Sequence, residues 1–417
     1  MNERAFVIVG AGLAGAKAAE TLRAEGFDGS VVLIGAEAQR PYERPPLSKE
    51  YLRGEAGREK LFVHDEDFYV SHSIELRSGC SATGLDPSRS ELTLSGGERL
   101  RYSRLLLATG AEPRRLSVPG AGLDGIHHLR SVEESDALRE RLDHGGRLVV
   151  VGGGWIGTEV AASARQRGLD VTLVDPSSVP LERVLGAEVG AVYRDIHADH
   201  GVQVLIGTAV EAFEGSGSVE RVRTGDGRAL ECDFVVVGIG ALPRTGLAVR
   251  AGIAHADGIL AGARLETSAP GVYAAGDVVR AHHPFYGERV RVEHWANALN
   301  QGAAAARAML GGRDAYNRLP YFFSDQYDVG MEYSGYARTW DRVVFRGDPA
   351  GREFIAFWLV GDRVVAGMNV NVWDVAEPIQ RLIRERVSVD DARLADPGVA
   401  LEDLGAAGKD PAPSVAK

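Results

Sequence analysis

Two glycine-rich motifs are the residues of this chain best suited to chemistry, because both have the spacing Gly-x-Gly-x-x-Gly. Each motif follows a run of apolar residues that is typical of a buried parallel strand. In a strand–loop–helix unit the first glycine permits the tight turn, the second lets the backbone approach a pyrophosphate, and the third lets helix and strand pack closely. The free N–H groups and the positive end of the helix dipole then hold the phosphates. Each motif therefore predicts a dinucleotide site, although a single motif of this kind also fits an ordinary glycine-rich turn.

The first motif, Gly10–Gly15, follows the predicted strand 6–9 and opens a helix-forming run. A second apolar run, 31–34, precedes Glu37. This carboxylate lies about 20 residues beyond the last glycine, where it can accept hydrogen bonds from a ribose. The residues assigned to dinucleotide binding here are Gly10, Gly12, Leu13, Ala14, Gly15 and Glu37.

The second motif, Gly152–Gly157, has similar surroundings. The run 147–151, which is apolar after Arg147, precedes it, a predicted helix (158–167) follows it, and the predicted strand 170–174 ends in Asp175. A carboxylate at Asp175 repels a 2′-phosphate and therefore favours NADH over NADPH. The residues assigned to this second site are Gly152, Gly154, Trp155, Ile156, Gly157, Asp175, Gly238, Ile239 and Gly240, with Arg183 near enough in sequence to influence the choice of nucleotide.

Two further segments could contact a bound cofactor. An apolar run ends in Gly276-Asp277, whose carboxylate can accept hydrogen bonds from a polyhydric chain such as a ribityl group; an N-cap aspartate is the alternative. Glu293-His294-Trp295 precedes the predicted helix 298–310, whose N-terminus can stabilise negative charge on a bound ring system. Trp295 can pack on or beside that ring or fill an interdomain core, and His294 can equally be a structural histidine.

The composition excludes several classes of function. The chain has 417 residues and a formal net charge of −11 without a run of lysines and arginines, so we expect neither nucleic-acid nor membrane binding. We predict no signal peptide and no membrane span, and expect a cytoplasmic protein that is a monomer or a homodimer. Cys80 and Cys232 form no C-x-x-C pair, which disfavours a redox-active dithiol and a cysteine-ligated metal site. We expect both to be small buried residues in strands, and we predict no metal site.

The predicted fold class is α/β, with two Rossmann-like dinucleotide-binding domains and a smaller C-terminal α+β domain. The two motif regions end in similar segments, because 108–114 reads Ala-Thr-Gly-Ala-Glu-Pro-Arg and 238–244 reads Gly-Ile-Gly-Ala-Leu-Pro-Arg. We interpret this likeness as an internal duplication of a nucleotide-binding domain. Beyond Pro320 the composition changes, and an aromatic-rich segment, 321–327, begins the last part of the chain.

Four motifs occur in an order that resembles one enzyme family. They are Arg44-Pro45-Pro46-Leu47-Ser48-Lys49, Ala108-Thr109-Gly110, Gly276-Asp277 and Glu293-His294-Trp295-Ala296. As a set they resemble the NADH-dependent, FAD-containing ferredoxin reductases that serve bacterial oxygenases, over about residues 5–390. The resemblance implies a glutathione-reductase-like architecture, FAD and NADH as cofactors, and a small iron–sulfur ferredoxin as the partner.

The resemblance also implies roles for individual residues. Lys49 is expected to pair with Glu159 beside flavin N5, where a hydride arrives from nicotinamide C4, and Trp295 is expected to lie at the ring. A solvated acid in the first turn of a helix is the alternative for Glu159. The electrons then pass to the ferredoxin, which feeds an oxygenase such as a cytochrome P450 or a Rieske dioxygenase. Besides the first motif, the expected FAD contacts are Glu37, Arg44, Lys49, Ala82, Ala108, Thr109, Gly110, Gly276, Asp277, Glu293, His294 and Trp295.

The expected domains follow from the same comparison of motifs. We predict an FAD-binding domain of residues 1–113 and 244–321, an NAD-binding domain of 114–243, a C-terminal domain of 322–404 and a disordered tail of 405–417. In the C-terminal domain the pattern predicts a meander of strands (342–346, 353–359, 363–372) followed by a helix (375–386). Trp373 could either line the flavin edge where electrons leave or fill the core.

Two other functions fit the same motifs. One is an NADH oxidase or a reductase of a small quinone-type acceptor, and the other is a redox-sensing flavoprotein that resembles apoptosis-inducing factor. Similar disulphide reductases carry a redox cysteine before or within the region 41–49, and this chain has none there. Disulphide reduction by a cysteine relay is therefore disfavoured.

Overall fold

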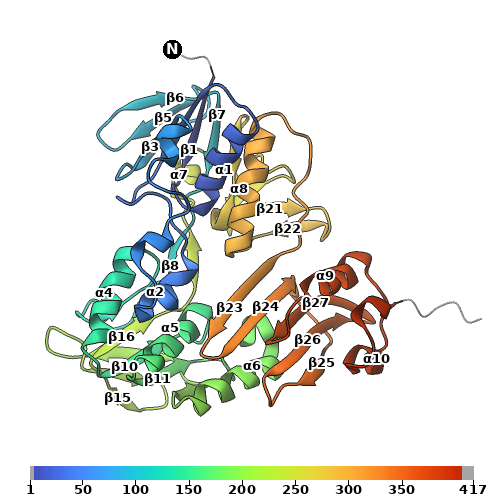
Figure 1. The fold of residues 1–417 in the computed structure, drawn as a ribbon. Coiled ribbons are helices and arrows are strands. Elements are labelled where there is room, and N and C mark those ends of the chain that lie inside the picture. Colours follow the sequence, from blue (N-terminus) through green and yellow to red (C-terminus); the bar gives the residue numbers. More distant parts are fainter. Residues whose placement is uncertain (1–3, 406–417) are drawn as a thin grey trace, which may run out of the picture. The chain divides into compact units, whose positions relative to one another are not determined.

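The computed structural model describes residues 4–405, which form two compact units (Figure 1). The first unit contains residues 4–114, 130–136 and 240–318. The second unit contains residues 115–129, 137–239 and 319–405. Each unit is built on its own parallel sheet and has its own hydrophobic core.

The parallel sheet of the first unit has the strand order β20-β7-β1-β2-β3. Its strands are β1 (Ala5–Val9), β2 (Ser30–Ile34), β3 (Ile74–Arg77), β7 (Arg104–Leu107) and β20 (Val272–Ala274). The predicted strands 6–9 and 31–34 are confirmed, and they read as apolar runs because the sheet is buried. Helices α1 (Leu13–Ala24) and α8 (Trp295–Met309) pack against each other so closely that a Cβ at Gly302 would lie 2.2 Å from the carbonyl oxygen of Ala14.

Shorter elements complete the first unit. They are the sheet of β4 (Ala82–Asp86), β5 (Glu91–Leu94) and β6 (Arg99–Arg101), the sheet of β18 (His255–Ala256), β19 (Gly258–Ala261), β21 (Val279–His283) and β22 (Glu288–Val290), and the helical segments η1 (Pro45–Ser48), α2 (Glu50–Arg53), η2 (Arg58–Leu61), α3 (Phe68–Ser71), α7 (Gly246–Arg250) and η3 (Gly276–Val278). The two segments with similar sequences also meet here. They form the antiparallel pair of β8 (Ala111–Pro113) and β17 (Ala241–Pro243).

The parallel sheet of the second unit repeats this arrangement, with the order β12-β11-β10-β16-β9. Its elements are β9 (Ile126–His127), β10 (Arg147–Val151), α5 (Trp155–Gln166), β11 (Asp170–Asp175), α6 (Glu182–Asp199), β12 (Gln203–Ile206) and β16 (Phe234–Val237), with the antiparallel sheet β13 (Val210–Glu214), β14 (Arg221–Thr224) and β15 (Ala229–Glu231). Helix α4 (Val132–Asp143) begins in the first unit and ends in the second. In both units the strand that precedes the glycine motif is central, and a three-stranded antiparallel sheet accompanies the parallel one. The predicted internal duplication is therefore confirmed.

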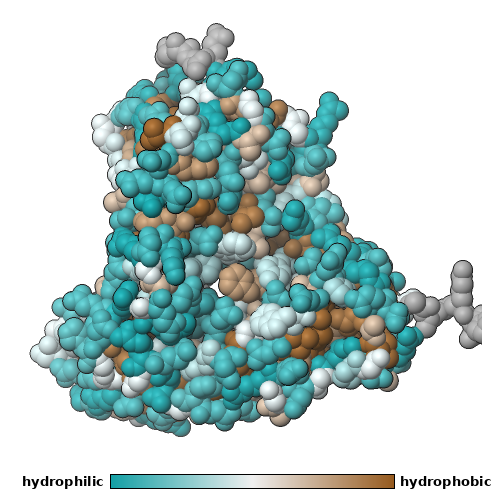
Figure 2. All heavy atoms as spheres, in the orientation of Figure 1, coloured by the Kyte–Doolittle hydropathy of each residue, from teal (hydrophilic) through white to brown (hydrophobic). Residues whose placement is uncertain are grey.

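The second unit also contains an antiparallel sheet of order β23-β24-β27-β26-β25. Its elements are β23 (Tyr321–Gln326), β24 (Val329–Gly335), β25 (Arg342–Asp348), β26 (Glu353–Val360) and β27 (Arg363–Val370), followed by α9 (Ala376–Glu385), α10 (Asp391–Ala395) and η4 (Leu401–Asp403). The predicted meander and the helix after it are confirmed, whereas β23 and β24 were not predicted as strands. Helix α6 covers this sheet, because its Leu185, Val189 and Tyr193 share a core with Trp358, whose indole N–H donates to the carbonyl oxygen of Leu185 at 3.0 Å. Apolar side chains also gather on the visible surface over this sheet (Figure 2).

The expectations for the cysteines were partly wrong. Cys80 is only half-buried and lies in the segment between β3 and β4, where its backbone N–H donates to the carbonyl oxygen of Gly35. Cys232 is buried as expected, but it follows β15 instead of lying within a strand. Burial raises the pKa of the Cys232 thiol to about 12, which keeps it protonated and unreactive. The predicted tail, 405–417, lies outside the described residues except for its first residue.

Candidate functional site

The first glycine motif has the geometry of a phosphate-binding loop. Gly10 has a φ of +118°, and a Cβ there would lie 2.0 Å from the carbonyl oxygen of Ala108. A Cβ at Gly15 would lie 1.9 Å from the carbonyl oxygen of Gly10, so both positions require glycine. A Cβ at Gly12 would meet no other described atom within 4 Å. Gly12 is also the N-cap of α1, beside the first N–H groups of the helix, where a pyrophosphate can bind.

The acid of the first site is held by two side chains. Glu37 accepts from Arg44 Nη2 at 2.7 Å through one carboxylate oxygen and from the Tyr42 hydroxyl through the other. Burial alone raises the pKa of Glu37, but the charge of Arg44 and these hydrogen bonds outweigh it and hold the pKa below the ordinary value. The carboxylate is therefore ionised and fixed before any ligand arrives. Glu37 and the glycine motif thus belong to the same unit, and the role of this acid in ribose binding stays a prediction.

A residue that the sequence did not single out completes the polar lining of this region. Arg130 donates from Nη2 to Asp277 at 2.6 Å, and its carbonyl oxygen accepts from Arg44. The same Nη2 lies 3.7 Å from the Cβ position of Gly110. Arg130 thus lies at the ends of the neighbouring strands β7 and β20, beside two predicted cofactor residues. Sequence alone gave no signal for it, because Arg130 belongs to no motif and lies far along the chain from Asp277.

The segment that carries Arg130 is tied to the Arg44–Lys49 loop. The hydroxyl of Tyr42 accepts from the Val132 N–H at 3.1 Å, and Ser135 Oγ donates to the carbonyl oxygen of Leu47 at 2.8 Å. Lys49 is only 5% exposed, and its Nζ donates to the carbonyl oxygen of Pro45 at 3.2 Å. The loop with the two prolines is therefore hydrogen-bonded to the segment 130–136 within the first unit.

The other predicted cofactor residues of the first unit lie beyond the ends of its strands, at the start of α8 or at the start of β4. Thr109 Oγ1 donates to the carbonyl oxygen of Arg244 at 2.8 Å, just beyond β7. The Gly276 N–H donates to Gln301 Oε1 at 2.9 Å, which fixes the strand end against α8. His294 is the N-cap of α8, and desolvation lowers its pKa to about 4 despite the charge of Asp277, so its ring is neutral at neutral pH. Trp295 begins α8 and is half-buried, Ala82 begins β4, and Glu293 is exposed and paired with Arg291.

The second glycine motif has the same backbone geometry as the first. Gly152 has a φ of +106°, and a Cβ there would lie 2.5 Å from the carbonyl oxygen of Gly238. A Cβ at Gly157 would lie 1.9 Å from the carbonyl oxygen of Gly152. At Gly154, the N-cap of α5, the nearest described atom would be 3.9 Å away. Close to Gly154 in the sequence, Ile156 is 41% exposed, so an apolar side chain lies on the surface next to the glycine loop.

The acid of the second site is held by the backbone. Asp175 accepts from the N–H of Gly153 at 2.6 Å and from the N–H of Ser177 at 2.8 Å. The chain then returns over the loop, because the Leu181 N–H donates to the carbonyl oxygen of Gly153 at 2.8 Å. Arg183 lies in the first turn of α6 and is exposed. The ring of Trp155 packs against Phe322 and Tyr193, with centroids 5.1 and 6.0 Å away.

Glu159 lies one turn into α5 and is 5% exposed. The alternative interpretation of Glu159 as a solvated acid at the start of a helix is therefore wrong. Its Oε1 accepts from Ser324 Oγ of β23 at 2.7 Å. Neither Ser324 nor its neighbour Gln326 was predicted to take part in the site. Trp373, in contrast, is 55% exposed, so it does not fill the core.

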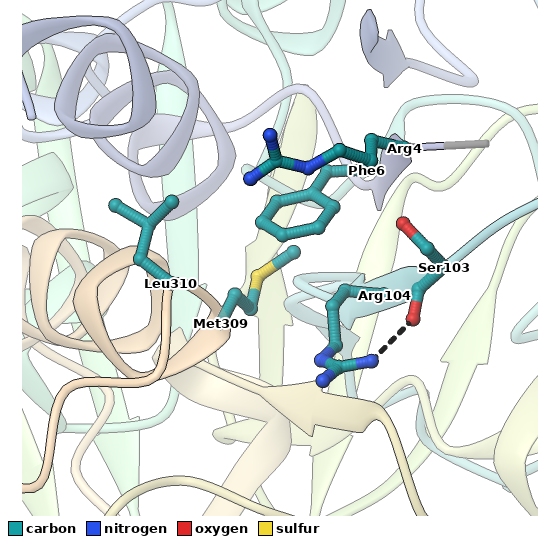
Figure 3. A pocket seen from close by; sticks show the side chains of 6 residues that line it. All are labelled: Arg4, Phe6, Ser103, Arg104, Met309 and Leu310. Atoms are coloured by element: carbon teal, nitrogen blue, oxygen red, sulfur yellow. Dashed lines mark hydrogen bonds between the residues drawn. The ribbon is translucent and has the colours of Figure 1, made fainter. Parts of the chain in front are cut away.

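One pocket of the first unit lies away from the glycine motif. It has a volume of about 240 Å³ and is lined by Arg4, Phe6, Ser103, Arg104, Met309 and Leu310 (Figure 3). These residues surround the amino-terminal ends of β1 and β7, whereas Gly10–Gly15 follows the carboxyl end of β1. Ligands of open parallel sheets bind at the carboxyl ends.

Among the described residues no group of three or more His, Cys, Asp or Glu side chains is placed to hold a metal ion. No helix within residues 4–405 is long and apolar enough to cross a membrane.

Comparisons with known proteins identify the family of this chain. Residues 4–302 match the pyridine nucleotide-disulphide oxidoreductase family, and residues 321–405 match the reductase C-terminal domain. Putidaredoxin reductase CamA of Pseudomonas putida is 38% identical over 409 residues, 97% of each chain. The ferredoxin–NAD(+) reductase component of the anthranilate 1,2-dioxygenase system of Burkholderia cepacia is 41% identical over 96% of this chain and 99% of that protein.

A solved structure is similar over the whole length as well. The reductase in the covalent putidaredoxin reductase–putidaredoxin complex has a TM-score of 0.93 and 38% identity, covering 98% of this chain and 100% of that chain. The family is named for disulphide chemistry, but the two cysteines of this chain are free and lie in different units. With its two duplicated dinucleotide folds and its matched C-terminal domain, the chain belongs to the pyridine nucleotide-disulphide oxidoreductase family, among the relatives of the ferredoxin reductases of oxygenase systems.

Proposed function

We propose that this protein passes electrons from NADH through FAD to a small iron–sulfur ferredoxin that serves an oxygenase. One observation carries the proposal above the others: a single chain contains two dinucleotide loops, each with an open second glycine, at Gly12 and Gly154. Two such sites are what an exchange between two nucleotide cofactors needs. Relatives that align with nearly the whole chain are named as ferredoxin reductases of oxygenase systems, which supports the same acceptor.

FAD fits the first unit. Its pyrophosphate would occupy the N-terminus of α1, where Gly12 leaves space and the N–H groups are directed outward. Glu37 would accept from the ribose of the adenosine, and Arg44 would keep that carboxylate in place. Arg130 and Asp277 together offer a cation and an acceptor for the ribityl and phosphate groups. FAD, when bound, supplies the ability to take up a hydride and release electrons singly.

NADH fits the second unit, in the predicted NAD-binding domain of residues 114–243. The N-terminus of α5 would hold its pyrophosphate, and the exposed Ile156 would be covered by the nucleotide. Asp175 would disfavour a 2′-phosphate and thus NADPH, as a like charge does. The FAD-binding domain would comprise residues 1–113 and 244–321, with 322–404 as the C-terminal domain.

Three residues would act closest to the reaction. By the family resemblance, the buried Lys49 and Glu159 would pair near flavin N5, and Trp295 would contact the ring at the start of α8. The cation of Lys49 would stabilise negative charge on the ring electrostatically. Most of the contribution of the chain is positioning of the two nucleotides. We place the reaction in the cytoplasm, where NADH is supplied.

The test is the dependence of turnover on a ferredoxin. FAD-loaded protein, NADH and cytochrome c are mixed with and without each ferredoxin of a panel, and cytochrome c reduction is followed. We expect reduction that depends on the ferredoxin and is faster with NADH than with NADPH. The variant Gly154→Ala, whose added methyl group points into the open side of the loop, is expected to keep its flavin and lose turnover.

Other outcomes would replace the proposal by one of its alternatives. Rapid oxygen consumption by NADH without any ferredoxin would identify an oxidase, and rapid reduction of small quinones a quinone reductase. A long-lived reduced charge-transfer complex together with a monomer–dimer shift would identify a redox sensor.

A further inference from the structure

A buried chain of hydrogen bonds connects the C-terminal sheet to the nucleotide-binding helix within the second unit. Ser324 Oγ donates to Glu159 Oε1 at 2.7 Å, and Gln326 Nε2 donates to Ser324 Oγ at 3.3 Å and to Thr158 Oγ1 at 3.1 Å. Gln326 Oε1 in turn lies 3.0 Å from His197 Nε2 of α6. Glu159 is 5% exposed and the other four side chains at most 1%. The network thus spans α5, α6 and β23 and is almost wholly buried.

The direction of each hydrogen bond in this network follows from the protonation state of His197 at one end of it. Burial lowers the pKa of His197 to about 4, so the ring is neutral at neutral pH and has one N–H. The amide oxygen of Gln326 accepts that N–H from Nε2, which leaves Nδ1 of His197 to accept from the Tyr327 hydroxyl at 3.1 Å. The Gln326 amide nitrogen then donates to Ser324 Oγ. The hydroxyl of Ser324 therefore donates its hydrogen bond to the Glu159 carboxylate.

These contacts lie at unusual places for polar groups. Buried side chains of β23 alternate with less buried ones, and the buried positions beyond Phe322 are Ser324 and Gln326 instead of apolar residues. Buried polar groups cost stability unless all of their partners are present, and a fully connected network specifies one arrangement of its members. A hydroxyl–carboxylate bond is also shorter and stronger than a neutral one.

We propose that Ser324, oriented by Gln326 and His197, is a positioning residue that fixes the carboxylate of Glu159 for the hydride-transfer step. This inference rests on the proposed function, in which Glu159 pairs with Lys49 at the flavin. The C-terminal domain then has a second task besides covering α6, since β23 sets the geometry of an acid on the nucleotide helix. Ser324 does not act on the cofactors itself; it acts through Glu159.

The test is a double-mutant cycle of Ser324→Ala and Glu159→Gln. In anaerobic rapid mixing of the FAD-loaded protein with NADH, each single variant is expected to reduce its flavin about tenfold more slowly, as expected for a lost bond to a charged group. The dissociation constant of NADH in the same experiment should change less than twofold. The double variant should be as slow as Glu159→Gln alone, because Ser324 has nothing left to position.

A readout without any activity checks the bond itself. In urea unfolding of the protein, the same cycle should show coupling between the two positions of about tenfold in the unfolding equilibrium constant. Ser334→Ala is the matched control, because Ser334 is equally buried in the neighbouring strand β24 and bonds to Gln380 instead of Glu159. It should show no coupling to Glu159→Gln and a normal rate of flavin reduction. Gln326→Leu should slow reduction less than Ser324→Ala.

Three results would overturn the proposal. Wild-type reduction in Ser324→Ala together with slow reduction in Glu159→Gln would show that Glu159 acts without the serine. Effects of the two substitutions that multiply in the double variant would give Ser324 a merely structural role. Normal reduction in Glu159→Gln would remove the role of Glu159 within the proposed function and, with it, the ground for this inference, while leaving ferredoxin-dependent turnover to be judged by its own assay.

Discussion

The two dinucleotide loops share their backbone and differ in how they hold their acid. Gly10 and Gly152 have φ values of +118° and +106°, and each donates its N–H to the strand next to it at 2.8 Å. In both loops the third glycine packs against the carbonyl oxygen of the first at a distance that excludes any side chain. The two copies therefore share the strand, the loop and the helix, together with the steric requirement for glycine at the first and third positions of the motif.

The acids, in contrast, do not occupy equivalent positions. Gly10 bonds to Ile34 and Gly152 to Val174, so Asp175 corresponds to Gly35, and Glu37 stands two residues later. The difference has a steric cause. A Cβ at Gly35 would lie 2.7 Å from the Cβ of Ala11, whereas the second loop has Gly153 opposite Asp175.

This exchange shows how two copies of one fold hold an acid at different positions. With alanine in the loop, the strand end must be glycine, and the acid moves outward, where Tyr42 and Arg44 hold it. With glycine in the loop, the strand end can carry the acid itself, and backbone N–H groups hold it. The position of the acid is thus set by residues that the shared glycines do not fix.

The largest expected effect is a difference in stability between substitutions of two glycines in one loop. Gly15 has no room for a side chain, whereas Gly12 has room for one. Gly15→Ala places a methyl group 1.9 Å from a backbone oxygen, so we expect the free energy of unfolding to fall by about 3 kcal/mol. Gly12→Ala meets no described atom, so its stability should change by less than about 1 kcal/mol, while flavin content falls. Urea unfolding and the flavin absorbance of the purified variants measure the two quantities.

The second loop supplies the control for that difference. Gly157→Ala should be as destabilising as Gly15→Ala and Gly154→Ala as mild as Gly12→Ala, but neither should act on flavin content. A loss of flavin in Gly154→Ala would show that the ligands of the two loops are assigned in the wrong order.

The steric exchange between the loops predicts a rescue. Gly35→Ala brings two Cβ atoms to 2.7 Å and should cost about 2 kcal/mol of unfolding free energy. Adding Ala11→Gly makes the first loop like the second and should restore most of that loss, because the obstructing methyl group is removed. Strictly additive losses in urea unfolding of the double variant would contradict the paired exchange.

The sequence was sufficient for the two glycine loops, which depend on neighbours in the chain. Spacing alone identified the glycine loops and the acids after them, since a strand, a turn and a helix N-terminus are built from consecutive residues. Arg130 is different, because it reaches Asp277 only when β7 and β20 lie side by side. No local pattern carries such a contact.

The strand β23 shows a second reason for failure. Its inward positions are Phe322, Ser324 and Gln326, so the alternation of apolar and polar residues that marks a strand is broken by two buried polar side chains. The same two side chains hold Glu159 and its neighbour Thr158. Sequence reasoning thus missed the strand at the place where packing was given up for a polar network.

The smallest expected effect concerns the acid of the first loop and its dependence on pH. Because the pKa of Glu37 in the folded protein lies below its ordinary value of 4.5, its ionised form stabilises the fold above that pH. Glu37→Gln should therefore lower the free energy of unfolding by about 1 kcal/mol at neutral pH, since the pair with Arg44 is less than one-third exposed. The gap between wild type and variant should close as the pH falls through the folded-state pKa, where wild-type Glu37 also becomes neutral. Urea unfolding across that pH range measures the gap. A gap that stays constant would mean that Arg44 and Tyr42 hold Glu37 by geometry and not by charge, and the two loops would then hold their acids in the same way.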